Sequence, residues 1–96
     1  MTQAFLKLDA DVKNEDYAND TGTTSCVVLI TDTHIYCANA GDSRAVLNNA
    51  DNAVALSEDH KPDNPEEIKR IRNASHFVED SRVDGNLALS RAFGDF

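Results

Sequence analysis

Cysteine is scarce, and the two cysteines present form neither a metal-binding nor a disulfide pattern. Cys26 and Cys37 each lie inside an apolar run, with no Cys-x-x-Cys pair and no cluster of cysteine and histidine. This excludes a disulfide-stapled scaffold and a zinc-ribbon type of fold. We expect both thiols to be free and buried in a reducing compartment, which favours a cytoplasmic or nuclear protein.

Basic residues and long apolar stretches are also few. The 96 residues include 9 Lys and Arg against 17 Asp and Glu, which gives a net charge of −8. Such a charge disfavours nucleic acid and anionic membranes as partners, and the longest apolar run, Cys26–Ile30, is too short to cross a bilayer. The excess of acidic residues is compatible with the binding of divalent cations, although a solvated acidic surface accounts for this excess more simply.

What the chain does contain is a series of short apolar runs separated by turn residues. The runs predict strands over 25–31, 34–40, 44–48 and 53–56. The first two are apolar on both faces, which indicates a sheet covered on both sides, yet strands joined by short turns pair antiparallel. Such a core needs more layers than 96 residues supply. We therefore expect a single partial domain over 1–96 with an incomplete core.

Helices are predicted at two places. The spacing of Ala4, Phe5 and Leu8 predicts a helix over 1–8, followed by an acidic connector over 9–20. The second helix begins after Asn64, a suitable N-cap, with Pro65 at the first helical position. Glu67 stands where a capping box has its glutamate, and Glu66 and Arg70 are spaced as an i,i+4 ion pair. The apolar stripe of this helix is narrow and predicts a surface position: Ile68, Ile71 and Ala74.

A hairpin is predicted near the end of the chain. Asp84-Gly85 separates two runs of strand-forming residues, and this dipeptide is a strong signal for a tight β-turn. Together with the other elements it predicts an α+β chain with antiparallel sheets.

Asp42 is the residue that points to chemistry. It lies in ANAGDSRAVL (38–47), where a Gly-Asp-Ser-Arg turn interrupts two apolar runs. A carboxylate in such a turn is held rigidly, as an oxygen ligand of a hard divalent cation should be. The alternative is that Asp42 caps the turn and pairs with Arg44, and the residues alone favour this alternative.

The remaining polar residues give weaker signals. His34, His60 and His76 are far apart and have no metal-ligand spacing. The basic residues of the second helix are more typical of a solvated face than of an anion site: Lys69, Arg70 and Arg72.

Four stretches together resemble the metal-dependent Ser/Thr protein phosphatases of the 2C type. They are TGTTSCVVLI, IYCANAGDSRAVL, LSEDHKPDNPEEIKRIRNA and RVDGNLALSRAFGDF, in the order of the family, and they extend over 21–96. The resemblance implies an α-β-β-α sandwich with antiparallel sheets, of which this chain would hold only a part. It also implies hydrolysis of phosphoserine and phosphothreonine in phosphorylated protein substrates by a water that two Mg²⁺ or Mn²⁺ ions activate.

The resemblance implies roles for individual residues as well. Asp42 matches an aspartate that helps to hold an additional, weakly bound metal ion. The segment 61–83 matches a flap beside the active site. His60, which directly precedes this segment, and Lys61 and Arg82 within it are candidates for contact with the substrate. Four further positions match signature residues with a structural role: Gly22, Thr23, Gly41 and Ser43.

The chain also departs from the pattern of the family. Ser75-His76 stands where the family often has Gly-Gly, and a glycine there would allow a positive φ. The stretches that supply the core metal ligands, the phosphate-contacting arginine and the proton donor have no counterpart in this sequence. The resemblance therefore assigns no catalytic residue to this chain, and we expect residues 1–96 alone to be inactive.

A second hypothesis belongs to a different class. A chain with a partial core exposes sheet edges, and such edges invite pairing with another chain. The protein would then be a non-catalytic, phosphatase-like interaction module that acts through segment 61–83 or through its sheet edges, with self-association as one outcome.

Overall fold

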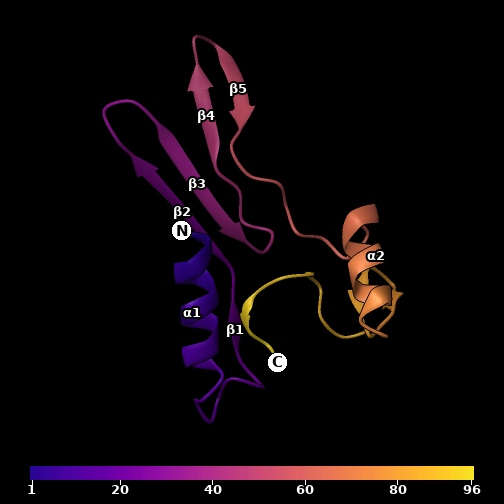
Figure 1. The fold of residues 1–96 in the computed structure, drawn as a ribbon. Coiled ribbons are helices and arrows are strands. Elements are labelled where there is room, and N and C mark those ends of the chain that lie inside the picture. Colours follow the sequence, from indigo (N-terminus) through magenta and orange to yellow (C-terminus); the bar gives the residue numbers. More distant parts are fainter.

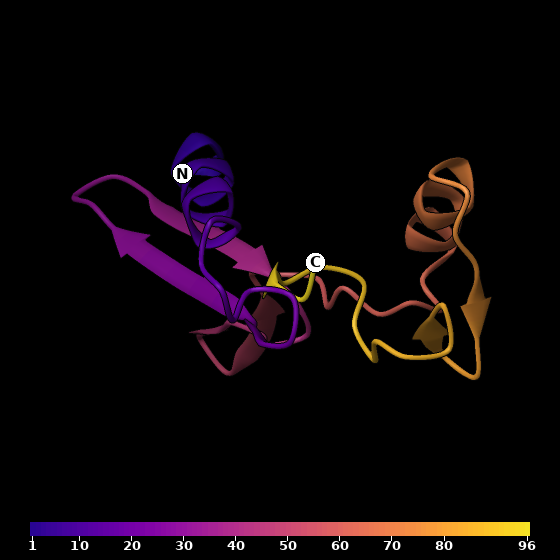
Figure 2. The same ribbon diagram turned by 90° about the horizontal axis from the view of Figure 1, so that it is seen from below.

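The structure, a computed structural model, describes residues 1–96 as two lobes joined by two connecting segments (Figure 1 and Figure 2). The larger lobe holds the first helix and the long hairpins, and the smaller lobe holds the second helix and a short hairpin. The elements in chain order are α1 (Thr2–Val12), β1 (Gly22–Thr23), β2 (Ser25–Ile30), β3 (Ile35–Ala40), β4 (Val46–Asn49), β5 (Asn52–Ala55), α2 (Pro65–Asn73), β6 (Val78–Glu79), β7 (Arg82–Val83) and β8 (Phe93–Gly94). No helix is both long enough and apolar enough to span a membrane.

All strand pairs are antiparallel, and each pair forms its own sheet. β1 pairs with β8, β2 with β3, β4 with β5, and β6 with β7. The longest pair is β2–β3, which runs from Ser25 opposite Ala40 to Ile30 opposite Ile35. The pairing confirms the predicted α+β class with antiparallel sheets, which remain separate two-stranded units.

The core is small. The buried apolar residues are Ala18, Ile71 and Phe93, with Pro62 also fully buried. The radius of gyration is 15.0 Å, whereas a compact chain of this length has about 12 Å. The β2–β3 sheet was predicted to be covered on both faces, but it is largely exposed. Ile30, for example, is 72% exposed to solvent. Within these residues the apolar strands therefore lack the layers that their sequence calls for.

Helix α1 is longer than predicted and packs on β8. It extends to Val12, so the first residues of the expected connector are helical. The ring of Phe5 meets that of Phe93 edge to face at 5.1 Å between centroids, and the Asp9 carboxylate accepts a hydrogen bond from the Gly94 amide at 3.3 Å. Leu8, expected on the buried stripe, is 51% exposed. The helix is therefore anchored at i and i+4 positions, Phe5 and Asp9.

Helix α2 begins as predicted, but its charged residues pair differently. Asn64 caps it, because its Oδ1 accepts a hydrogen bond from the Glu66 amide at 3.0 Å, and Pro65 is the first helical residue. The capping box is absent, because the Asn64 amide donates to the Lys61 carbonyl and the Glu67 carboxylate accepts from Arg70 and Arg91 instead. The predicted pair of Glu66 with Arg70 is also wrong: Arg70 donates to Glu67 at 2.9 Å, an i,i+3 pair.

The hairpin after α2 turns earlier than predicted. Its tight turn is Asp80-Ser81, between β6 and β7, and both residues have positive φ, 50° and 60°. Asp84-Gly85 does form a turn, but it closes only one bridge, between Val83 and Leu87. Strand β7 thus lies between two successive turns, where the sequence predicted one hairpin with a single turn.

The helix exit tolerates the departure from glycine. Ser75 has a φ of 66°, the left-handed region that favours glycine. The neighbouring His76 shares a hydrogen bond with Asp84 at 2.6 Å between Nδ1 and Oδ2, and the same carboxylate accepts from the Phe77 amide at 3.1 Å. Ser75 therefore adopts the backbone geometry that is typical of glycine. The two residues that follow it, His76 and Phe77, are held by hydrogen bonds to the Asp84 carboxylate.

Candidate functional site

The candidate site is the contact between two segments that the chain order separates. One is the GDSR turn (residues 41–44), which leaves β3 and leads to β4. The other is the EDHK segment (residues 58–61), which leaves β5 and leads toward α2. Three residue pairs join them, Gly41 with His60, Asp42 with Lys61, and Arg44 with Asp59. In addition, Asn39 of β3 donates a hydrogen bond to the Glu58 carbonyl. The site therefore brings together two of the sequence stretches that carry the resemblance described above.

Gly41 is required by its backbone and by its surroundings. Its φ is 110°, and a Cβ added there would lie 2.4 Å from Cγ2 of Thr24. Ser43, two residues further along the turn, forms a hydrogen bond with Thr24, with 2.8 Å between the two hydroxyl oxygens. Any side chain at position 41 would push the turn away from Thr24, which the Ser43 hydroxyl holds close.

Asp42 faces a cation. Its carboxylate forms an ion pair with the ammonium of Lys61, and its side chain is 29% exposed. Arg44, expected to brace Asp42, does not: its guanidinium forms two hydrogen bonds to Asp59, at 2.9 Å and 2.8 Å. The hydrogen bonds from Arg44 lower the pKa of Asp59 below its ordinary value. Asp42 is thus left to pair with Lys61 alone.

His60 lies against the GDSR turn with a neutral ring nitrogen. Its Nδ1 accepts a hydrogen bond from the Gly41 amide at 3.0 Å, and its own amide donates to the Gly41 carbonyl at 2.9 Å. Burial lowers the pKa of His60, and the positive charge of Arg91 lowers it further. The acceptor role at Nδ1 assigns the ring proton to Nε2.

The other predicted substrate residues lie together. Lys61 and Arg82 line one surface cavity of about 400 Å³, together with Asp63 and Asp80. Arg82 also donates a hydrogen bond to the Asn86 carbonyl at 2.8 Å, which fixes its position beside the hairpin turn. His60 lines a different cavity, of about 260 Å³, so it is separated from the two cations with which it was grouped.

The remaining signature positions lie where β1 meets β8. Gly22 is opposite Gly94 in the strand pair, and Thr23 is opposite Phe93. A Cβ on Gly22 would lie 1.9 Å from Oδ2 of Asp95. These positions bring the two short strands close together, and Thr23 directly precedes Thr24, which contacts the GDSR turn.

Glu67, predicted from the sequence only as the glutamate of a capping box, is instead a buried carboxylate with two arginine partners. Its side chain is 7% exposed, and it accepts hydrogen bonds from Arg91 and Arg70. Burial alone would raise the pKa of Glu67, but these hydrogen bonds outweigh it and lower the pKa to about 2. The i,i+3 spacing to Arg70 was the only local signal, because Arg91 is distant in sequence.

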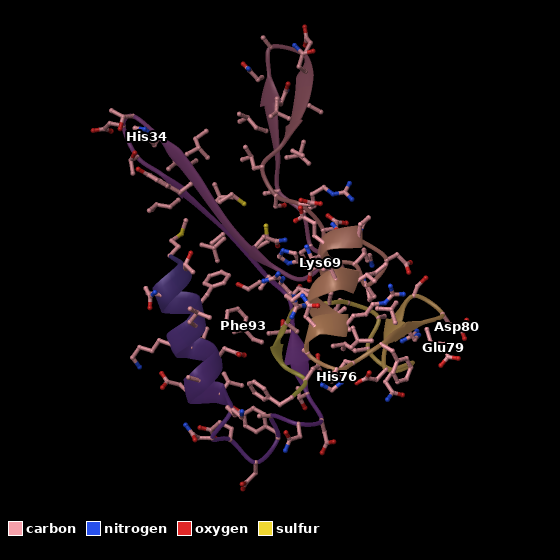
Figure 3. All side chains as sticks on the ribbon, turned by 45° about the vertical axis from the view of Figure 1, so that its right-hand side comes forward. His34, Lys69, His76, Glu79, Asp80 and Phe93 are labelled. Atoms are coloured by element: carbon pink, nitrogen blue, oxygen red, sulfur yellow. The ribbon has the colours of Figure 1, made fainter.

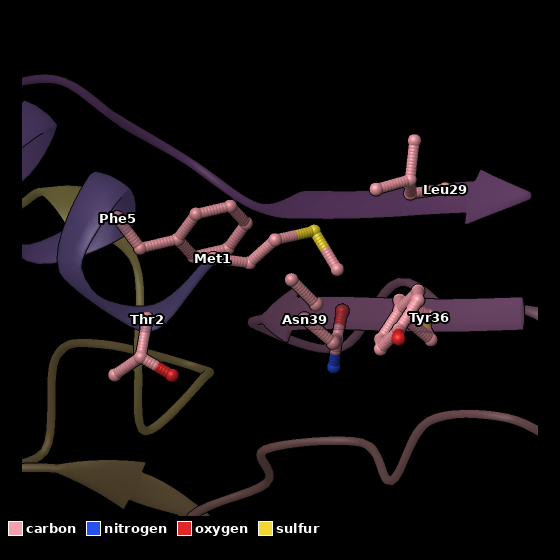
Figure 4. Close-up of a pocket in the computed structure, with 8 residues that line it drawn as sticks. Met1, Thr2, Phe5, Leu29, Tyr36 and Asn39 are labelled. Carbon is pink, nitrogen blue, oxygen red and sulfur yellow. The ribbon is translucent and has the colours of Figure 1, made fainter. Parts of the chain in front are cut away.

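Another cavity, of about 590 Å³, lies between α1 and the β2–β3 sheet (Figure 4). Figure 4 shows Met1, Phe5, Leu29 and Tyr36 around it. It contains no carboxylate and no basic side chain. Its lining suits apolar packing rather than phosphate chemistry.

The structure contains no group of three or more His, Cys, Asp or Glu side chains that could hold a metal ion. His34 lies at the tip of the β2–β3 hairpin and His76 at the exit of α2, far from one another (Figure 3). Asp42 nevertheless fits as one metal ligand, because it is a carboxylate in a fixed turn that already faces a positive charge, the Lys61 ammonium.

Comparison with known proteins identifies the family to which the chain is similar. The sequence model of the family described as "Protein phosphatase 2C" matches residues 1–96. A probable protein phosphatase 2C of Caenorhabditis elegans is 50% identical over 98% of this chain, and protein phosphatase 2C homolog 3 of Schizosaccharomyces pombe is 48% identical over 100% of it. The chain spans 27% and 24% of the lengths of these two relatives.

A solved structure is also similar. A phosphatase from a pathogenic strain of Toxoplasma gondii is 52% identical and superimposes with a TM-score of 0.58. The match covers 64% of this chain and 20% of that protein. The likeness therefore extends to the fold as well as to the sequence.

Proposed function

The chain belongs to the protein phosphatase 2C family, and from this premise we propose that it is part of an enzyme that hydrolyses phosphoserine and phosphothreonine in proteins. The observation that carries the proposal is the contact between the GDSR turn and the EDHK segment, which holds Asp42 opposite Lys61. Both segments belong to the stretches through which the chain matches its relatives.

Asp42 is the residue of this chain that would hold a metal ion. Its carboxylate is one oxygen ligand for Mg²⁺ or Mn²⁺, and further ligands would come from water, from phosphate and from residues outside this chain. Bound divalent ions lower the pKa of water and so supply hydroxide at neutral pH. The ammonium of Lys61 balances the charge of the Asp42 carboxylate and would be replaced there by a bound metal ion. Gly41 and Ser43 give the turn the shape that holds the carboxylate.

Segment 61–83 would select the phosphorylated substrate. The ammonium of Lys61 and the guanidinium of Arg82 line one cavity, and both groups suit a phosphate. Arg82 is fixed by its hydrogen bond to Asn86. Two acidic side chains line the same cavity, Asp63 and Asp80, which would favour peptides with a basic residue near the phosphate.

The experiment is phosphate release from a phosphothreonine peptide by the intact protein. We expect activity that EDTA abolishes and that Mn²⁺ restores. Residues 1–96 alone, assayed in parallel, should release no phosphate above the uncatalysed level, since they contribute one metal-binding carboxylate. Activity that persists in EDTA would contradict the proposal.

A second candidate function is favoured by the exposed β2–β3 sheet. Val27, Val28, Leu29 and Tyr36 are each more than two-fifths exposed, which is unusual for an apolar sheet. In a non-catalytic interaction module these side chains would pack on a partner or on a second copy. Size-exclusion chromatography separates the two functions, because a compact, stable monomer contradicts the interaction module.

A further inference from the structure

We propose that His60 is a positioning residue: the acceptor nitrogen of its neutral ring holds the GDSR turn and thereby sets Asp42 opposite Lys61. This differs from the role in substrate contact that the sequence suggested. The part that concerns Asp42 as a metal ligand rests on the proposed function, whereas the hold on the turn does not.

The carrying geometry is a pair of hydrogen bonds in opposite directions. The Gly41 amide donates to Nδ1 of His60 at 3.0 Å, and the His60 amide donates to the Gly41 carbonyl at 2.9 Å. Gly41 is buried, so water does not replace a lost partner of its amide. The ring therefore satisfies a buried donor for which the structure shows no other acceptor.

His60 is itself held from a third side. Its carbonyl accepts a hydrogen bond from the Ser90 amide at 3.0 Å, which ties the EDHK segment to the chain that returns from the smaller lobe. The ring is half-buried and lines a cavity with Asn39, Arg91 and Phe93. The backbone of His60 is thus held by bonds that do not involve its ring, and the ring nitrogen serves as the acceptor for the Gly41 amide.

The consequence for Asp42 follows from its place in the chain. Gly41, at a φ of 110°, sets the direction in which the next residue leaves the strand. Lys61, the partner of Asp42, directly follows His60. The two hydrogen bonds between residues 41 and 60 therefore fix the register of the ion pair beside them.

The experiment replaces the ring and observes glycine amides. His60→Asn places a side-chain oxygen near the position of Nδ1, and His60→Leu keeps a similar volume without an acceptor. In protein labelled with ¹⁵N-glycine, the reporters are the four glycines of this chain, Gly22, Gly41, Gly85 and Gly94. Gly22, Gly85 and Gly94 monitor folding, because they lie outside the GDSR turn.

We expect His60→Leu to move the amide proton signal of Gly41 upfield and to speed its hydrogen exchange about tenfold, the effect of losing one hydrogen bond. His60→Asn should restore most of both. The signals of the other glycines should stay in place. A Gly41 signal that is unchanged in His60→Leu, or equally changed in both variants, overturns the proposal.

Titration of the intact protein with Mn²⁺ tests the link to Asp42, because this paramagnetic ion broadens nearby amide signals and the intact protein supplies the further metal ligands that the proposed function requires. We expect Mn²⁺ to broaden the Gly41 signal in the unmodified protein. The same broadening should need a several-fold higher Mn²⁺ concentration in His60→Leu, and His60→Asn should restore a requirement close to that of the unmodified protein. Equal Mn²⁺ requirements in all three proteins overturn the claim that His60 positions Asp42. Absence of broadening in the unmodified protein contradicts the proposed function, while the amide shifts still support the hold of His60 on the turn.

Discussion

Glu67 and Arg91 form an ion pair across 24 residues, with Nη2 of Arg91 2.8 Å from Oε1 of Glu67. Nε of the same guanidinium lies 3.1 Å from Oε2, so the pair is bidentate. The guanidinium of Arg70 also donates a hydrogen bond to the Glu67 carboxylate, and it donates another to the Ser90 carbonyl at 2.6 Å. Because Glu67 belongs to α2 and Arg91 lies two residues before β8, this pair ties the smaller lobe to the larger one.

Loss of the carboxylate should therefore destabilise the protein. We expect Glu67→Gln to lower the free energy of unfolding by about 2 kcal/mol, the usual value for a hydrogen bond to a charged group. Urea unfolding followed by circular dichroism measures it. Glu66→Gln is the matched control, since Glu66 is exposed and should change stability little. Equal effects of the two substitutions would show that the ion pair adds nothing.

Acid should unfold the protein through the same residue. The pKa of Glu67 is about 2 in the folded chain, against 4.5 ordinarily. Its contribution to stability is thus complete above about pH 4.5 and disappears as the pH falls toward 2. A difference of this size corresponds to about 3 kcal/mol. Urea unfolding at a series of pH values should show this slope between pH 4.5 and 2, and a slope unchanged in Glu67→Gln would contradict it.

Lys61 should compete with metal ions for Asp42. Removing its charge in Lys61→Met should tighten Mn²⁺ binding about fivefold, the equivalent of about 1 kcal/mol for an exposed ion pair. Water proton relaxation in a Mn²⁺ titration measures the affinity. Lys69→Met removes an equal charge from the exposed face of α2 and serves as the control. Identical affinities for the two variants would exclude competition by Lys61.

Gly41 should tolerate a side chain less well than Gly85 does. Both have positive φ, 110° and 72°, but a Cβ meets Thr24 at 2.4 Å in the first case and nothing nearer than 3.6 Å in the second. We expect Gly85→Ala to cost about 1 kcal/mol, from backbone strain, and Gly41→Ala to cost about 3 kcal/mol, from strain and the clash. Thermal unfolding compares them, and equal costs would refute the contact with Thr24.

Local signals in the sequence were sufficient for the elements that local interactions form. The cap at Asn64 with Pro65 predicted the start of α2, and the apolar runs predicted β2 and β3. The turn chemistry was less decisive, because Asp80-Ser81 adopts the same left-handed geometry as Asp84-Gly85 without a glycine. That choice depends on pairing of β6 with β7 rather than on the dipeptide alone.

The partners of charged residues could not be predicted in this way. Arg44 is near Asp42 in sequence but pairs with Asp59, and Glu67 pairs with Arg91, because folding brings distant segments into contact. The same holds for His60, whose sequence neighbourhood suggested substrate contact, whereas the structure places its ring on the Gly41 amide. Residue type predicted that these groups would be partnered, and only the fold identifies the partner.

The most direct test of the account is the Mn²⁺ dependence of phosphate release from a phosphothreonine peptide by the intact protein. Asp42→Asn removes the proposed ligand, and Asp51→Asn changes an exposed aspartate in the β4–β5 turn as the control. We predict that Asp51→Asn behaves like the unmodified protein, whereas Asp42→Asn needs at least about tenfold more Mn²⁺ for the same rate. An Mn²⁺ requirement that is the same in all three proteins would contradict the assignment of Asp42 as a metal ligand.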